Sequence, residues 1–147
     1  MTRRFFWLWD QHPNFFLVLV TVAVANLGIG LGYWLGPDAW HSSPSFATVN
    51  DTLPWNPHLD FDVVGALLVL VGIGILTGLG SSFTIARAAL VFGAGFAFFL
   101  AIGQVVAALT DTLRGAAGPY LWAFLAVCQM AQAGEPPRNP AAASGPR

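Results

Sequence analysis

Four long apolar stretches constrain this chain more than any other feature of its sequence. They cover about 15–35, 61–81, 88–109 and 116–133 in a chain of 147 residues. The hydrocarbon core of a bilayer is about 30 Å thick, and a helix needs about 20 residues to cross it. Barrels, the other structure that satisfies the backbone in lipid, need alternating apolar and polar residues, which these stretches lack. The sequence therefore predicts an all-α, integral membrane bundle of four transmembrane helices.

Composition supports this prediction and excludes some classes of function. Hydrophobic residues make up 56% of the chain and charged residues 9%, which is too little charge for a soluble domain of this size. The formal net charge is −1 and the arginines form no dense basic patch, so we expect no nucleic-acid partner. The lipid bilayer is the expected surrounding, and no cofactor is expected.

The arginines that flank the stretches predict the orientation of the bundle, because basic residues beside membrane spans prefer the cytoplasm. Four spans with the N-terminus inside leave only Arg114 outside. The cytoplasmic arginines are then Arg3, Arg4, Arg87, Arg138 and Arg147. We therefore expect both termini in the cytoplasm. The expected organisation is an interfacial segment over 1–14, a transmembrane domain over 15–133 with an outer loop at 36–60, and a disordered tail over 134–147.

Small residues lie four apart on one face of three of the predicted spans. Such faces let helices approach each other closely in lipid. Two interpretations remain open: packing of helices within one chain, and an interface between copies in a homo-oligomer. The residues are Gly28, Gly32, Gly74, Gly78, Ala89, Gly93, Ala97 and Ala101.

Uncharged polar side chains are the second feature of the spans. They are Asn26, Thr77, Gln104 and Gln129. Each needs a partner in lipid, and an interhelical hydrogen bond of about 1 kcal/mol accounts for such residues without a further role. A second interpretation is a polar seam that becomes wetted when several copies assemble. Charged residues and histidine are not found deep in any span, which argues against a proton relay or an ion-coupled transporter.

The outer loop holds the candidates for metal or catalytic chemistry. His58, Asp60 and Asp62 alternate along the chain, but no second motif completes a metal site. An enzyme acting on lipid or peptidoglycan precursors would rest on these three residues and His41. The single cysteine, Cys128, is expected to be a small buried hydrophobe. We predict a non-enzymatic protein with no catalytic, cofactor-binding or metal-binding residues.

The loop and the second stretch carry a resemblance to a group of phage proteins. Ser43-Pro44-Ser45-Phe46-Ala47 is followed by Leu53-Pro54-Trp55 and then by the apolar run from Val64 to Gly72. This order is similar to that of small multi-span, holin-like membrane proteins of tailed bacteriophages, although Val64 stands where that group often has Trp before the glycine. The resemblance implies a multi-pass protein of the bacterial inner membrane that self-associates and permeabilises or depolarises the membrane. The alternative is a structural or interaction subunit that docks a membrane protein partner through the outer loop.

Overall fold

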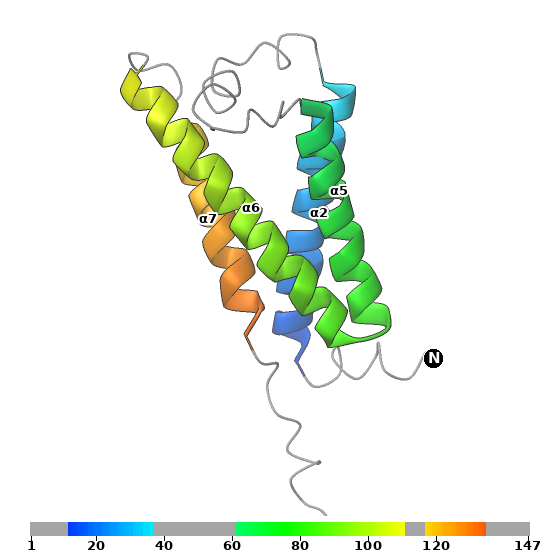
Figure 1. The fold of residues 1–147 in the computed structure, drawn as a ribbon. Coiled ribbons are helices and arrows are strands. Elements are labelled where there is room, and N and C mark those ends of the chain that lie inside the picture. The colour runs from blue at the N-terminus through cyan, green and yellow to red at the C-terminus, as the bar shows by residue number, and fades with distance from the viewer. Residues whose placement is uncertain (1–11, 37–60, 111–116, 135–147) are drawn as a thin grey trace, which may run out of the picture.

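The computed structural model describes residues 12–36, 61–110 and 117–134. Four helices account for almost all of them: α2 (Pro13–Leu35), α5 (Phe61–Gly80), α6 (Phe83–Thr110) and α7 (Ala117–Gln132) (Figure 1). The all-α prediction is confirmed. The segments predicted at 1–14, 36–60 and 134–147 lie almost wholly outside the described residues.

Local sequence explains where two of the helices begin. Pro13 opens α2 at the start of the helix, where its missing N–H would have had no partner and its fixed φ suits the helix. Helix α6 begins at Phe83 rather than at residue 88, because the carbonyl oxygen of Ser82 accepts the N–H of Ile85 at 2.9 Å. A tight turn therefore joins α5 to α6, and the N–H of Ser81 closes it by donating to the carbonyl oxygen of Gly78 at 3.3 Å.

Three of the four helices are long and apolar enough to cross a membrane. The qualifying segments are Pro13–Leu35, Asp62–Gly80 and Phe83–Val106, of 23, 19 and 24 residues. Helix α7 has 16 residues, which at about 1.5 Å per residue is shorter than a hydrocarbon core of about 30 Å. The structure thus supports a membrane protein with three candidate spans, and a fourth span through α7 stays a prediction.

The outward faces of the helices are apolar. Leu70 of α5, Phe98 of α6 and Phe124 of α7 are 62%, 59% and 69% exposed. Soluble monomers rarely expose contiguous apolar surface on this scale. Hydrocarbon solvates such side chains well, so the exterior of the bundle matches the membrane setting that the apolar stretches predict.

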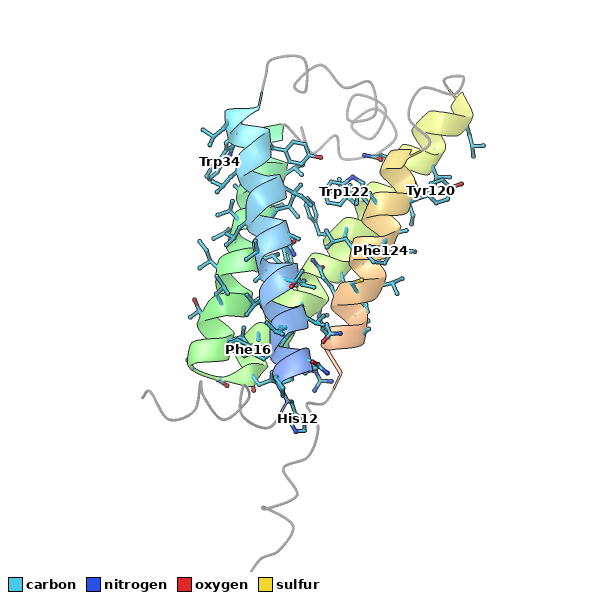
Figure 2. The ribbon with its side chains drawn as sticks, turned by 180° about the vertical axis from the view of Figure 1, so that it is seen from behind. His12, Phe16, Trp34, Tyr120, Trp122 and Phe124 are labelled. Carbon is cyan, nitrogen blue, oxygen red and sulfur yellow. The ribbon has the colours of Figure 1, made fainter. Side chains whose placement is uncertain are left out.

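The helices pack most extensively as two pairs, α2 with α5 and α6 with α7, and α5 also packs against α6. The turn between α5 and α6 joins the pairs at one end, where α2 begins and α7 ends (Figure 1). From that end the pairs diverge, as both views show (Figures 1 and 2). Helices α2 and α7 meet across a narrow contact, which we call the seam.

Two apolar clusters fill the interior. The lower cluster, on the side of the α5–α6 turn, contains Phe16, Leu19, Val22, Ala23, Val71, Ile75, Leu90 and Ala133. The upper cluster, nearer the opposite end, contains Val64, Leu68, Ala97, Leu100, Ala101, Trp122, Leu125 and Ala126. Buried Asn26, Gly93 and Gln129 lie along their helices between the members of the two clusters. We call these three residues the polar layer.

Candidate functional site: a buried polar layer between helix pairs

A hydrogen bond between two side-chain amides crosses the seam. The Nε2 group of Gln129 in α7 donates to Oδ1 of Asn26 in α2 at 3.1 Å. Both side chains are fully buried. The Nδ2 group of Asn26 donates to the carbonyl oxygen of Val22 in its own helix at 2.8 Å, which fixes the orientation of this amide. Two of the four predicted intramembrane polar residues are therefore brought together.

One of the two amide oxygens in this pair has no hydrogen-bond donor among the described groups. The buried Oε1 of Gln129 accepts no hydrogen bond from any described group. A buried acceptor without a partner costs about 1–3 kcal/mol, whereas an interhelical hydrogen bond in a membrane returns about 1 kcal/mol. The polar layer therefore adds little net stability to the bundle.

Gly93 of α6 makes room for the Gln129 side chain. A Cβ atom at position 93 would lie 2.6 Å from Oε1 of Gln129 and 2.7 Å from Cγ1 of Val71. Real Cβ atoms do not come this close to their neighbours, so any larger residue here must displace one of them. The predicted small residue at position 93 thus lies against the Gln129 side chain, and through it α6 contributes its backbone to the polar layer.

Contacts within the α2–α5 pair are made at the level of the backbone. A Cβ at Gly30 would lie 2.7 Å from the carbonyl oxygen of Gly65, and a Cβ at Gly65 would lie 2.8 Å from that of Gly30. One heptad further along α5, a Cβ at Gly72 would lie 2.9 Å from the carbonyl oxygen of Ala23. Glycine is required at these positions because a carbonyl oxygen of a helix cannot move aside as a side chain can.

Glycines also hold α5 against α6 close to the turn. A Cβ at Gly74 would lie 2.9 Å from Cβ of Ala89, and a Cβ at Gly78 would collide with the backbone nitrogen of Ala86. The structure therefore places Gly74, Gly78 and Ala89 at a contact within the chain. Ala97 and Ala101 of α6 are buried in the upper cluster.

The remaining predicted positions lie away from these contacts. Gly28 is exposed, and a Cβ there would meet nothing within 4 Å; Gly32 is partly buried. Thr77 is exposed, and its carbonyl oxygen accepts the hydroxyl of Ser81 at 2.7 Å. Gln104 is partly buried in the upper half of α6. The polar layer does not include Thr77 or Gln104.

Sequence reasoning missed Gly30, Gly65 and Gly72, the glycines at which α2 and α5 approach most closely. The available signal is a spacing of seven: Ala23 with Gly30 on α2, and Gly65 with Gly72 on α5. A spacing of seven keeps small residues along one side of a helix over two turns. The prediction instead used spacings of four, which on α2 selected Gly28 on the exposed face.

Aromatic contacts close the wide end of the bundle. The rings of Tyr33 in α2 and Trp122 in α7 stack with centroids 6.5 Å apart and planes 16° apart. Figure 2 shows Trp122 on the side of α7 that faces α2, whereas Tyr120 lies on the opposite side. The indole Nε1 of Trp34 donates to the carbonyl oxygen of Asp62 at 3.0 Å, which joins the end of α2 to the start of α5.

The residues weighed for metal or catalytic chemistry are mostly not described. His41, His58 and Asp60 lie outside the described residues, and Asp62 occupies the first turn of α5. In the part of the chain that the structure describes, no three His, Cys, Asp or Glu side chains gather to hold a metal ion. Cys128 is a free thiol and is partly buried on α7.

Comparisons with known proteins return nothing for this chain: no family model, no curated protein and no solved structure matches it.

Proposed function

We propose that this chain is a non-enzymatic, holin-like protein of phage type that self-associates in the bacterial inner membrane and permeabilises or depolarises it. The observation that carries the proposal is the polar layer. Asn26 and Gln129 place two amides inside a bundle whose surroundings are apolar, at the narrow contact between two helix pairs. Amides at such a place can be wetted when the pairs separate or when copies assemble.

The proposed topology has four spans and both termini in the cytoplasm. The start of α2, the α5–α6 turn and the end of α7 lie at one end of the bundle (Figure 1). Exposed Arg87, in the second turn of α6, lies at that same end. A single cytoplasmic end that collects these segments agrees with the preference of arginine for the cytoplasm. Helix α7 would cross as the shortest span, paired along its length with the longer α6.

Self-association is supported by glycines that the single chain leaves open. Gly28 on α2 and Gly95 on α6 are exposed in mid-helix, and a Cβ at either would meet nothing within 4 Å. A glycine inside a helix costs about 1 kcal/mol relative to alanine. Because no described group packs against these two glycines, close approach of another helix in lipid is the role we assign to them.

Membrane potential during induced expression in a bacterium tests the proposal, with a voltage-sensitive dye as reporter. We expect the potential to collapse abruptly once the protein has accumulated, before the cells die. A strain that expresses an unrelated multi-span protein at an equal membrane level controls for overloading of the membrane. A steady potential at high expression would contradict the proposal.

A second candidate is an interaction subunit, and one observation favours it. The Trp34–Asp62 hydrogen bond holds together the two helix ends from which the segment 36–60 departs. A segment with fixed ends is suited to presenting a docking surface. Affinity capture with the segment intact, and with it replaced by a short Gly-Ser linker, tests this candidate; it fails if both forms capture the same membrane proteins.

A further inference from the structure

We propose that the Asn26–Gln129 hydrogen bond is a latch, and that its release lets the α6–α7 pair swing away from the α2–α5 pair about the α5–α6 turn. This inference rests on the proposed function, because the opened bundle is the form that would admit water. It concerns regulation of the same polar layer: the closed bundle shields the amides, and the open bundle exposes them.

The packing within the pairs differs in kind from the packing between α2 and α7. Within the α2–α5 pair, glycines bring backbone against backbone at Gly30 and Gly65. Across the seam, α2 and α7 meet through the ends of side chains, namely the amide pair and the stacked rings of Tyr33 and Trp122. The pairs are therefore the units that stay intact. Opening parts the seam and also separates α5 from α6 beyond the hinge, where the contacts are apolar, as between Val71 and Gly93.

The α5–α6 turn has the properties of a hinge. Gly78 and Ala86 bring the two helices into backbone contact immediately beside the turn. Between them, a Cβ at Gly80 would meet no described group within 4 Å, and Ser81 and Ser82 are exposed, so among the described helices none packs over the turn. The pairs already diverge from this end (Figures 1 and 2). Rotation about the turn widens the seam while leaving the Gly78–Ala86 contact near the axis.

The chemistry of the amides explains why the Asn26–Gln129 hydrogen bond would stay intact in a single copy and break when several copies assemble. In pure hydrocarbon, parting leaves Nε2 of Gln129 without its acceptor and Oδ1 of Asn26 without its donor, so the closed form is favoured. In the closed form Oε1 of Gln129 accepts no hydrogen bond from a described group, and an amide oxygen has two lone pairs. Amides from another copy, or water, can therefore replace the internal bond and satisfy this acceptor as well.

Reversible cross-linking across the seam tests the latch. Tyr33→Cys and Trp122→Cys, at the rings that stack across the seam, are combined with Cys128→Ala, so that both amides stay in place. The two thiols are joined by a short bis-thiosulfonate reagent that a reductant cleaves. The matched control joins Phe15→Cys to Phe83→Cys with the same reagent. The rings of Phe15 and Phe83 lie 6.1 Å apart, so this cross-link joins α2 to α6 close to the hinge. Membrane potential is recorded before and after addition of dithiothreitol.

We expect the seam cross-link to preserve the potential, its reduction to restore the collapse, and the hinge cross-link to leave the collapse unchanged. Collapse at the normal time with the seam cross-linked would overturn the latch and leave the proposed function standing. Absence of collapse in the wild-type arm would overturn both, so the two failures are distinguishable.

A single substitution keeps the proposal testable if the cysteine variants do not accumulate. Asn26→Ser shortens the side chain so that it no longer reaches Gln129, and losing one interhelical hydrogen bond shifts the open-to-closed ratio about fivefold. We expect the potential to collapse earlier at an equal membrane level of protein. An unchanged or later collapse at that level would overturn the latch.

Discussion

Replacing Gly93 by alanine should destabilise the bundle, although alanine is the better helix former. The new Cβ would lie 2.6 Å from Oε1 of Gln129 and 2.7 Å from Cγ1 of Val71, so at least one of these side chains must move. Overpacking of this kind costs about 1–3 kcal/mol, and a displaced Gln129 loses a hydrogen bond worth about 1 kcal/mol. The gain in helix propensity returns about 1 kcal/mol. The expected net loss is about 1–3 kcal/mol.

Reversible unfolding in mixed micelles of a mild detergent and sodium dodecyl sulfate measures this loss. Gly95→Ala is the matched control, because it lies in the same helix and its Cβ would meet nothing within 4 Å. A double-mutant cycle with Gln129→Ala identifies the share of Gln129, since shortening this side chain removes its contact with the new Cβ and leaves that of Val71, so the two effects should add incompletely. Equal stability of the Gly93→Ala and Gly95→Ala proteins would refute the close approach at Gly93.

Three further predictions concern packing, association and topology. Gly65→Ala should lower the free energy of unfolding by about 1–3 kcal/mol relative to the Gly95→Ala control in the same assay, because its Cβ would lie 2.8 Å from a carbonyl oxygen of α2; a difference within a few tenths of a kcal/mol would contradict this. Gly28→Leu should not destabilise the single chain, because leucine is the better helix former and a Cβ there meets no described group within 4 Å. It should reduce chemical cross-linking between copies in membranes, whereas an undiminished cross-linking ladder would remove Gly28 from the interface. The topology is tested with Ser82→Cys and Gly134→Cys, each made in a chain without its native cysteine. Both should react with a membrane-impermeant maleimide only after the inner membrane is permeabilised. Labelling of Gly134→Cys in intact spheroplasts would rule out the four-span topology.

The helices were predictable because their signal is local. Uninterrupted apolar runs of near-spanning length leave the backbone no alternative in lipid, and turn residues separate the runs. The predicted stretch 61–81 differs from the observed Phe61–Gly80 only at its last residue. The start of α6 was placed too late because Phe83, Thr84 and Ile85 belong to the helix once Ser82 begins it. That start depends on the turn geometry, which apolar periodicity does not encode.

The choice of packing face was not predictable from one helix at a time. Gly28 and Gly32 share one side of α2, and Gly30, two positions from each, lies on the opposite side. The partner helix decides which side is used, and Gly65 on α5 selects Gly30. A four-residue spacing finds a face that permits close packing. It does not show whether the partner is in the same chain, in another copy, or absent.

The polar residues were found in the sequence, but their pairing was not. Asn26 and Gln129 are separated by 103 positions, and neither residue carries information about the other. A weaker signal exists in hindsight. Gln129 continues the buried face of α7 formed by Trp122, Ala126 and Ala133, which would have predicted an inward-facing amide there. Thr77 is exposed near the end of α5 and Gln104 lies in the upper half of α6, so both are outside the polar layer.

An amide pair is a costly way to hold a membrane bundle together, and this cost is the strongest physical argument about its role. Apolar side chains of similar volume would pack at least as well in lipid, and the closed structure leaves Oε1 of Gln129 without a donor among the described groups. The polar layer makes all of its possible hydrogen bonds only in an open or assembled form, in which Oε1 of Gln129 also accepts one. Replacing both residues by leucine separates the two roles. If the amides act in an open or assembled form, the Asn26→Leu/Gln129→Leu protein should unfold no more readily than wild type in detergent and yet fail to depolarise cells. If it depolarises them normally, the layer is only a packing solution, and the polar interior has no part in the activity.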